Sequence, residues 1–480
     1  MTGIERAAYA PEAVSCGIVH VGLGAFHRAH QAVYVDAWLG RNRGGPWGIR
    51  AANIRSNGAI VAQLRAAGFR YHVAAYASRE RVAVRAIRSI CDATFAGAGD
   101  DAGRERLLAW LSAPETRIVT LTISEKGYGL RPADGALLES DPGLAHDIAN
   151  PLAPRTAPGF LVEALRRRRE AGAAPFTVLS CDNMPANGVR TRAAVAQLAR
   201  QSSPELADWI EREVAFPSSM VDRIVPAVTP ETRARIAALI GFDDPAAVAC
   251  EAFSQWVVED RFPLGRPDWE TEGVEMVADV RPFEAMKLRM LNGAHSLLAY
   301  VGLLAGHETV AQAVADERLT ALVRRYWTEA RASLEIDGDI TRHANVDAYA
   351  ARLLERFAND SLEHKLMQIA MDGSQKLPQR WLAGAATCVA NGIRADATAL
   401  GVAAWMLHVR GTRPDGRTHV VDDPLAQRFA DIHRSAGDAD AVDALLAVRD
   451  VFAAELAEHA EFRRDVRACY ERLARGELPL

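Results

Sequence analysis

The pattern of hydrophobic and polar residues divides this 480-residue chain into two parts of different character. In the first part, short apolar runs rich in β-branched residues alternate with stretches of helical periodicity. Strands are predicted over 18–22, 47–54, 69–77, 81–90, 116–124 and 175–183, with a strand and a turn over 247–269. Helices are predicted over 25–39, 159–171 and 190–201. This alternation is typical of an α/β fold with a parallel sheet.

From residue 283 onward the pattern is almost entirely helical. The predicted helices are 283–305, 308–316, 318–333, 347–358, 361–371, 377–391, 394–410, 424–435, 440–446 and 449–475. The change of pattern places a domain boundary near residue 279. We therefore expect an α/β domain over residues 1–278 and a mostly α-helical domain over 279–480, and a chain of this length favours two cores over one.

The first predicted strand leads into a glycine turn, Gly22 to Gly24, and then into a helix. Glycines at this place let the backbone approach a pyrophosphate at a helix N-terminus, as in a Rossmann-type dinucleotide site. The match to GxGxxG is incomplete, because His27 replaces the third glycine, and an ordinary strand-turn-helix has the same pattern. His27, Arg28 and His30 are candidate phosphate donors, although packing or capping also accounts for the histidines.

The end of the second predicted strand bears on the choice of dinucleotide. An acidic residue at this point binds the ribose 2′-hydroxyl of NAD, whereas an arginine accommodates the 2′-phosphate of NADP. This chain has Arg55, Ser56 and Asn57 there, with no acid. The residues alone leave NAD and NADP open.

Polar residues also follow later strands. Glu125 comes after the strand over 116–124, and Asn183 ends the apolar run over 175–183. Because ligands bind at the carboxyl ends of strands in open α/β sheets, we expect both residues near a common cleft. Further on, Asp222 and Arg223 stand between apolar neighbours and either form an internal ion pair or face the cleft.

The segment FEAMKLRMLNGAH, residues 283–295, carries the strongest candidate chemistry. At about 100° per residue, Asn292 lies about 140° from Lys287 on a helix and His295 about 80° from it. The three side chains can therefore line one side of the helix, and Glu284 is a helix neighbour of Lys287. A lysine, an amide and an imidazole together suit proton transfer without a metal. The alternative is a surface helix with scattered polar groups.

Composition excludes several classes of protein. A formal net charge of −5 argues against nucleic-acid binding, and the single basic run, 166–169, fits a solvated helix face. The six cysteines form no CxxC motif, which argues against a disulfide scaffold and a zinc site. We expect no secretory signal and no membrane span, and hence a cytoplasmic location.

Six stretches, read together, resemble the long-chain polyol dehydrogenase family, also called the mannitol dehydrogenase family. They are GLGAFHRAHQA, TISEKGY, SCDN, FPSSMVDRIVP, KLRMLNGAHS and QIAMDGSQKLPQR. The resemblance covers nearly the whole chain, and it looks strongest toward the fructuronate-reducing members. It implies a Rossmann-type N-terminal domain, a mostly helical C-terminal domain, and NAD(P)-dependent chemistry without a metal.

The resemblance also implies roles for individual residues. Lys287 matches the catalytic lysine, with Asn292 and His295 as its helix partners. Asn183 matches a second amide that forms an oxyanion hole with Asn292, and Glu284 a carboxylate that aids proton exchange. Val221 and Asp222 match substrate contacts. The cofactor-binding residues expected here are Ile18, Val19, His20, Val21, Gly22, Leu23, Gly24, Ala25, Phe26, His27, Arg28, Ala29 and Glu125.

The expected reaction is D-fructuronate plus NADH to D-mannonate plus NAD, in a monomer or small homo-oligomer. Hydride transfer leaves charge on the carbonyl oxygen, which the amides stabilise, while Lys287 exchanges the proton if desolvation lowers its pKa from about 10.4. Lys376 and His364 are expected to bind the uronate carboxylate; alternatively, Lys376 caps a helix and Arg380 faces solvent. A dehydrogenase of mannitol, arabinitol or sorbitol is the main alternative, and a non-catalytic NAD-binding protein is a remote one.

Overall fold

The computed structural model describes residues 4–5, 8–131, 134–338, 346–362 and 364–478. The chain forms two compact units, Met1–Val280 and Arg281–Leu480, against a predicted boundary after residue 278. Among the described residues, no helix has both the length and the apolar character needed to cross a bilayer.

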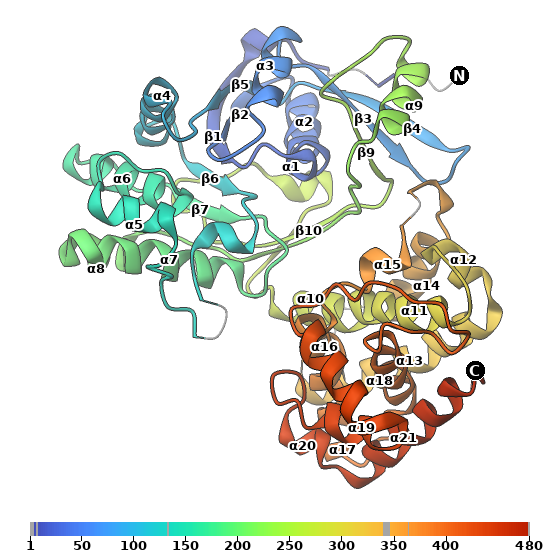
Figure 1. Ribbon diagram of the computed structural model, residues 1–480. Coiled ribbons are helices and arrows are strands. Elements are labelled where there is room, and N and C mark those ends of the chain that lie inside the picture. The colour runs from blue at the N-terminus through green and yellow to red at the C-terminus, as the bar shows by residue number, and fades with distance from the viewer. Residues whose placement is uncertain (1–3, 6–7, 132–133, 339–345, 363, 479–480) are drawn as a thin grey trace. The chain divides into compact units, whose positions relative to one another are not determined.

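The first unit is built on a five-stranded parallel sheet (Figure 1). Its spatial order is β5-β2-β1-β6-β7. The strands are β1 (Val14–Val21), β2 (Gly45–Asn53), β5 (Ile90–Phe95), β6 (Ile118–Leu121) and β7 (Thr177–Ser180). The order runs outward from β1 in one direction and then from β6 in the other, so the carboxyl ends of β1 and β6 form the topological switch point where such sheets bind ligands.

Both faces of this sheet are covered, because successive side chains of a strand point to opposite faces. Ile18 joins one hydrophobic core with residues of the helices α2 (Gln31–Asn42) and α3 (Gly58–Ala66). Val19 and Val21 join another, with residues of α4 (Asp101–Ser112), α6 (Ala157–Glu170) and α7 (Asn187–Ser202). The prediction of a Rossmann-type domain is confirmed.

Two three-stranded sheets complete the first unit. One has the order β11-β10-β8 and the other β4-β3-β9. Their strands are β3 (Tyr71–Tyr76), β4 (Val82–Ile87), β8 (Ser219–Asp222), β9 (Val248–Glu251), β10 (Gln255–Glu259) and β11 (Glu275–Val277). Strand β3 pairs antiparallel with β4 but parallel with β9, so this sheet joins distant parts of the chain.

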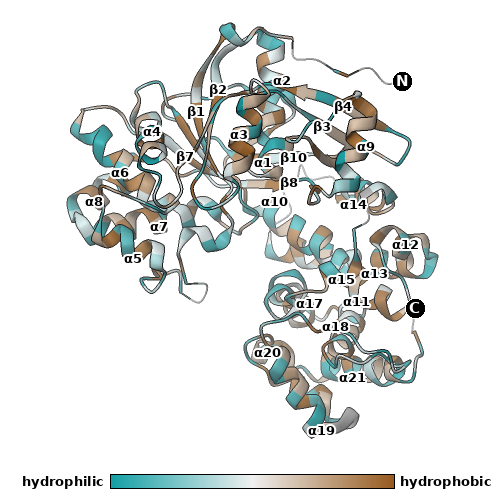
Figure 2. Ribbon diagram, turned by 45° about the horizontal axis from the view of Figure 1, so that its top comes forward, coloured by the Kyte–Doolittle hydropathy of each residue, from teal (hydrophilic) through white to brown (hydrophobic). Residues whose placement is uncertain are grey.

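The remaining helices of this unit are short. They are η1 (Pro11–Ala13), α1 (Ala25–Ala29), η2 (Glu125–Tyr128), α5 (Pro142–Ala149), α8 (Pro204–Glu213), α9 (Pro230–Ile240) and η3 (Trp269–Glu272). Helices α5, α6, α8 and α9 each begin with an Asp, Ser or Thr cap and a proline in the first turn, a strong start signal. Helix α8 buries Leu206, Ala207 and Ile210 and exposes its charged residues, as its brown and teal stretches show in Figure 2.

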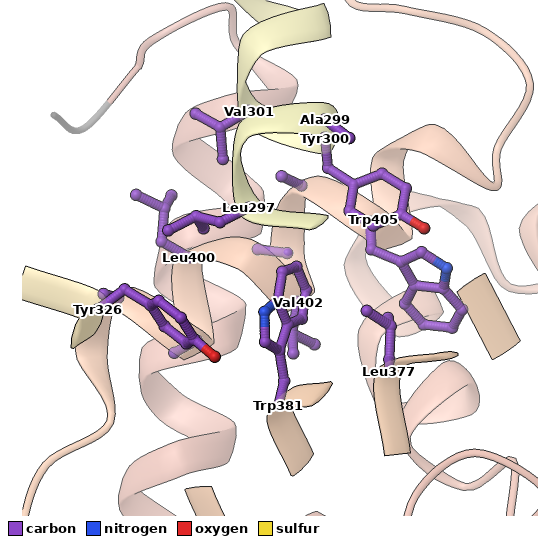
Figure 3. Packing of buried hydrophobic residues seen from close by; sticks show 14 of the residues in the cluster. Leu297, Ala299, Tyr300, Val301, Tyr326, Leu377, Trp381, Leu400, Val402 and Trp405 are labelled. Atoms are coloured by element: carbon purple, nitrogen blue, oxygen red, sulfur yellow. The ribbon is translucent and has the colours of Figure 1, made fainter. Parts of the chain in front are cut away.

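All the regular elements of the second unit, among its described residues, are helices. Its elements are α10 (Arg281–Met286), η4 (Lys287–Asn292), α11 (Gly293–Leu304), α12 (Val310–Ala315), α13 (Glu317–Asp337), α14 (Val346–Phe357), η5 (Asp360–Leu362), α15 (Leu366–Ile369), α16 (Gly373–Leu377), η6 (Pro378–Leu382), α17 (Ala383–Ala390), α18 (Asp396–His408), α19 (Ala426–Leu446), α20 (Ala454–Ala457) and α21 (Ala460–Ala474). Helices α11 and α18 are buried along nearly their whole length. Figure 3 shows Leu297 and Tyr300 of α11 near Trp381 and Trp405 in this core.

Some predicted elements differ from the observed ones in the first unit. The helix predicted over 25–39 is interrupted at His30, whose φ of −122° and ψ of −91° separate α1 from α2. The strand predicted over 81–90 is wrong in extent, because β4 ends at Ile87 and β5 begins at Ile90 in a different sheet. Ser89 lies between them, and its hydroxyl donates to the Ala32 carbonyl.

The second unit has its own corrections. The helix predicted over 361–371 contains residue 363, outside the described residues, and elsewhere is only the end of η5 and the short α15. The two helices predicted over 424–446 are the single helix α19, and the one predicted over 449–475 is divided into α20 and α21. The helices predicted over 283–305 and 377–391 both contain a π-helical segment, η4 and η6.

Candidate active site

The glycine turn after β1 has the geometry that a bound pyrophosphate needs. Gly22 has a φ of +109°, and a Cβ there would clash with the Thr122 carbonyl oxygen, so glycine is required. At Gly24, the N-cap of α1, a Cβ would lie 3.7 Å from its nearest neighbour, the Gly22 carbonyl oxygen, so the backbone there is open to a ligand. These residues fit the phosphate-binding turn of a dinucleotide site.

Most side chains of the expected cofactor-binding stretch face the protein interior. Ile18, Val19, His20, Val21, Leu23, His27, Arg28 and Ala29 are buried, whereas Gly22, Gly24, Ala25 and Phe26 are partly exposed. The rings of His20 and His27 stack with their centroids 3.4 Å apart, and burial lowers the pKa of His20 to about 3 and that of His27 well below its usual value. Both imidazoles are therefore neutral at physiological pH.

Arg28 and His30 also make internal contacts. The Arg28 guanidinium donates to the carbonyl oxygens of Gly24 and Ala246, and the His30 Nε2 lies 3.0 Å from the Gln255 carbonyl oxygen. The Arg28 side chain thus holds the Gly22–Gly24 turn from the protein interior. The exposed part of the turn consists mainly of backbone, the part of a dinucleotide site that contacts phosphate.

The end of β2 is tied to the same turn. The Asn53 side-chain amide donates to the carbonyl oxygens of Leu23 (3.3 Å) and Asn57 (3.2 Å). Asn57 has a φ of +59°, and Arg55 and Ser56 beside it are exposed. The structure therefore places Arg55 at the position where the dinucleotide ribose is recognised in this fold.

The ends of β6 and β7 carry Glu125 and Asn183, both exposed. Glu125 forms an ion pair with Arg190, at 2.9 Å between Oε1 and Nη1. Ser124, just before it, has a φ of 64° and a ψ of 161°, a region that only glycine visits freely and that costs about 1–3 kcal/mol. Non-glycine residues with positive φ also follow β2 and β7, at Asn57 and Ala186, so backbone strain gathers at the carboxyl edge of the sheet.

Strand β8 carries the expected substrate residues Val221 and Asp222, which are 3% and 5% exposed. The sequence left two alternatives for Asp222 and Arg223, an internal ion pair or a position facing the cleft. The hydrogen bonds described for the Arg223 side chain go to backbone carbonyl groups. Its guanidinium donates to the carbonyl oxygens of Ala29 (2.5 Å) and Glu251 (3.1 Å). Arg223 thus links β8 to the end of α1.

In the second unit, the segment with the catalytic candidates is wound as a π-helix. Element η4 begins at Lys287 and ends at Asn292. A π-helix bonds residue i to i+5 and turns less per residue than an α-helix, so Asn292 lies closer to the side of Lys287 than the predicted angle of about 140°. Lys287, Asn292 and His295 are buried, at 6%, 9% and 6% exposure, and Glu284 is partly exposed one turn earlier. The surface-helix alternative is wrong for these three residues.

Side chains from neighbouring elements donate to the carbonyl groups of this segment. The Tyr326 hydroxyl of α13 shares its proton between the Arg289 carbonyl (2.5 Å) and the Arg380 carbonyl (3.1 Å). The indole N–H of Trp327 donates to the Met290 carbonyl, and that of Trp381 donates to the Gly293 carbonyl, each at 2.9 Å. A π segment disturbs the regular backbone ladder, and two carbonyl groups of η4, those of Arg289 and Met290, accept from these donors.

His295 lies in positively charged surroundings. Burial, with the positive charges of Arg356 and Arg380 and the neighbouring His364, lowers its pKa well below the usual value, so the ring is neutral. Its Nε2 is buried and has no hydrogen-bond partner among the described residues, and the same holds for Nδ1 of His364. The two ring centroids are 5.1 Å apart. Two unpaired imidazole nitrogens in one place can bind a polyhydroxylated ligand.

The cations of the motif DGSQKLPQR both make contacts within the second unit. Lys376 donates to the Met371 carbonyl oxygen at 2.6 Å, and burial and Arg380 lower its pKa. Arg380 is partly buried rather than solvent-exposed, and donates to Ser296 Oγ at 3.0 Å. His364 lies within the helix predicted over 361–371 but precedes the observed α15.

Sequence reasoning missed the aromatic donors Tyr326, Trp327 and Trp381 around η4. One signal was available. Gly293 interrupts an otherwise strongly helical run, and an isolated glycine in a helix often marks a close approach. A Cβ at Gly293 would clash with the Tyr326 hydroxyl.

The described residues contain no group of three or more His, Cys, Asp or Glu side chains arranged to hold a metal ion. The six cysteines are all free thiols.

Comparison with known proteins places both units. Two family models match the chain, the mannitol dehydrogenase Rossmann domain over residues 16–271 and the mannitol dehydrogenase C-terminal domain over residues 279–474. The chain is 44% identical over 460 residues to the D-mannonate oxidoreductase of Escherichia coli K12, covering 95% of this chain and 93% of the relative. It is also 44% identical over 460 residues to the uncharacterized oxidoreductase YeiQ of the same organism, covering 95% and 92%.

A solved structure shares the fold of the whole chain. The Pseudomonas fluorescens mannitol 2-dehydrogenase, in ternary complex with NAD and D-mannitol, is 36% identical to this protein. The TM-score is 0.83, and the match covers 98% of this chain and 94% of that one.

Proposed function

Because the chain belongs to the mannitol dehydrogenase family of NAD-dependent CH–OH oxidoreductases, we propose that it interconverts D-fructuronate and D-mannonate. The observation that carries this proposal is the positive charge around His295. The Arg380 guanidinium donates to Oγ of Ser296, the residue after His295, at 3.0 Å, and Arg356 and Arg380 both lower the His295 pKa. A carboxylate is favoured in such surroundings. The 44% identity to D-mannonate oxidoreductase, against 36% to the mannitol 2-dehydrogenase, supports the same choice.

The cofactor site proposed for the first unit consists of the Gly22–Gly24 turn, the end of β2 and Glu125. The backbone of the turn would hold the pyrophosphate. When bound, NAD(H) supplies or accepts the hydride. Arg55 and Ser56 replace the usual acidic residue, so NADPH is a necessary control substrate.

The catalytic roles proposed here follow from the charge that the reaction develops. Reduction of a ketone leaves negative charge on its oxygen, and a preorganised amide donor to that oxygen contributes about 3–4 kcal/mol. Asn183 and Asn292 each supply such an amide. Lys287 gives the oxygen its proton, or removes it in oxidation, and Glu284 exchanges that proton with solvent.

The remaining residues orient the substrate. Neutral His295 has a buried Nε2 without a partner among the described residues, which suits a hydrogen bond to a substrate hydroxyl. Val221 and Asp222 are assigned to the substrate on the first unit. His364 and Lys376 are assigned to the carboxylate. The Lys376 ammonium has three donors; one is bonded to the Met371 carbonyl, and Asp372 Oδ2 lies 4.0 Å from the nitrogen.

The test is NADH oxidation followed at 340 nm with D-fructuronate and D-fructose in parallel. We expect fructuronate to be reduced with the higher kcat/KM. In Lys376→Met we expect the KM for fructuronate to rise roughly tenfold or more, as for loss of a hydrogen bond to a charged group, with little change for fructose. The exposed Lys365→Met is the matched control. Equal loss on both substrates would refute the carboxylate role.

A polyol dehydrogenase is the second candidate, because the structure with 36% identity contains D-mannitol and aligns over 98% of this chain. Higher kcat/KM with fructose, or oxidation of mannitol, arabinitol or sorbitol in preference to mannonate, would assign the protein to that group. The proposed role of Lys287 would be unchanged.

A further inference from the structure

The carboxylate of Asp182, the residue before Asn183, is hydrogen-bonded to the strained turn that follows β6. It accepts hydrogen bonds from the backbone N–H of Ile123 at 3.0 Å and of Ser124 at 2.9 Å. Ser124 is the residue with φ 64° and ψ 161°. The carboxylate therefore compensates a backbone conformation that the chain would not adopt by itself.

A third donor reaches the same carboxylate. The Tyr128 hydroxyl donates to Asp182 Oδ2 at 2.7 Å, and lies 2.6 Å from Ser180 Oγ. Tyr128 and Ser180 are 1% and 0% exposed. A buried chain of hydroxyl groups thus ends on Asp182 and connects β7 with η2, the turn that carries Glu125.

The backbone carbonyl group of Asp182 is bonded to a different element, α7. Its carbonyl oxygen accepts from the side-chain amide of Asn187 at 3.0 Å. Asn187 is fully buried, donates to the Ser219 carbonyl at 2.7 Å, and accepts from the Ser219 N–H at 2.9 Å. Ser219 begins β8, which carries Val221 and Asp222. The end of β7 is therefore bound to β6 by the carboxylate and to β8 by Asn187.

We propose that Asp182 is a positioning residue that sets the side-chain amide of Asn183 relative to the Ser124–Glu125 turn and to β8. Asn183 is exposed and directly follows this doubly bonded residue, so Asp182 fixes the backbone position from which the Asn183 amide extends. Small misplacement of a reacting group lowers a rate by about 100-fold. The inference rests on the proposed role of Asn183 but not on which ketone the enzyme reduces.

The test is a double-mutant cycle of Asp182→Asn and Asn183→Ala, with kcat, KM and NADH affinity as readouts. The asparagine side chain of Asp182→Asn has the same shape as the aspartate. Its NH2 group, however, cannot accept a hydrogen bond, so it faces at least one of the donors of Ile123, Ser124 and Tyr128. We expect kcat to fall 10- to 100-fold, with KM for the ketone and Kd for NADH within threefold. In the Asn183→Ala background the same substitution should lower kcat less than threefold, because the amide it positions is already absent.

Asp147 offers a matched control in the same unit. It is 3% exposed, and its carboxylate accepts from the backbone N–H of Arg155 (2.8 Å) and Thr156 (2.9 Å) and from the Thr156 hydroxyl (2.6 Å). Like Asp182, Asp147 thus accepts from two backbone N–H groups and one hydroxyl, and His146 Nδ1 lies 3.1 Å from its Oδ1 in addition. Asp147→Asn should lower the melting temperature as much as Asp182→Asn does, and leave kcat within twofold of wild type.

Three results would overturn the inference: equal losses of kcat in both backgrounds, a rise in KM with unchanged kcat, or an equal loss of kcat in Asp147→Asn. If Asp182→Asn does not fold, Tyr128→Phe removes one donor and leaves both backbone N–H groups. We then expect a three- to tenfold loss of kcat that again vanishes beside Asn183→Ala. If wild type reduces fructose and not fructuronate, only the substrate proposal fails, and the cycle is measured with fructose.

Discussion

Removal of the Tyr326 hydroxyl should separate the stability of the second unit from the geometry of its catalytic segment. In Tyr326→Phe the carbonyl groups of Arg289 and Arg380 lose the proton they share, at 2.5 and 3.1 Å. A buried acceptor left without its donor costs about 1–3 kcal/mol. No cavity forms, because the ring remains. We therefore expect the free energy of unfolding to fall by about that amount.

The same substitution should also lower kcat, through the winding of η4. The Tyr326 proton holds a carbonyl within η4, and without it the segment can return toward α-helical winding. Five residues of α-helix place Asn292 about 140° from Lys287, which removes the amide from the proposed alkoxide. Loss of one preorganised donor lowers kcat by about 10²–10³-fold, so we expect a loss that approaches 100-fold.

The assay is kcat and KM from NADH oxidation at 340 nm, with thermal unfolding measured on the same preparations. Thr398→Val is the control, because it also deletes a buried hydroxyl bonded to α13, at 2.7 Å from Glu329, but contacts no carbonyl of η4. It should lose comparable stability and keep its kcat. Our reasoning is wrong if Tyr326→Phe is destabilised with full kcat, or if both variants lose kcat alike.

Two further predictions concern the rest of the molecule. Burial raises the pKa of Glu329 from 4.5 to about 7. The stabilisation by protonated Glu329 is therefore complete below pH 4.5 and is lost as pH rises through 7. Relative to Glu329→Gln, the free energy of unfolding of wild type should fall by about 2 kcal/mol over that range. Melting temperatures from pH 4.5 to 8 test this, and a constant difference would contradict it. At the glycine turn, Gly22→Ala should lose both stability and NADH affinity, because its Cβ clashes with Thr122, whereas Gly24→Ala should lose NADH affinity alone. Tight NADH binding by Gly24→Ala, measured by fluorescence titration, would exclude close backbone approach there.

The sequence predicted the elements whose pattern is local. The run before Gly22, the strand-end residues Glu125 and Asn183, and the helical second half all depend on short-range periodicity and turn residues. The pairing of β3 with β9 was not predictable in this way, because nothing within either strand specifies a partner about 175 positions away. The division of 81–90 between two sheets was missed for the same reason.

The candidate site shows the same limit. Lys287, Asn292 and His295 were identified from their residue types and spacing, but their angular relation was calculated for an α-helix. The carbonyl groups in and directly after the π segment accept from side chains of α13 and η6, about 35 and 90 positions further along the chain. Apolar periodicity does not distinguish one π turn inside a helix, and the buried role of Tyr326 is visible only in three dimensions.

The pairing of β3 with β9 also governs when the first unit can finish folding. Val73 pairs with Val248 and Tyr76 with Glu251. On a ribosome adding about 5–20 residues per second, the later strand emerges roughly 9–35 seconds after the earlier one. Until then one side of β3 is an open strand edge, the kind of surface that recruits other chains. During synthesis the edge of β3 is thus exposed to aggregation until β9, in the last third of the Rossmann unit, has been made.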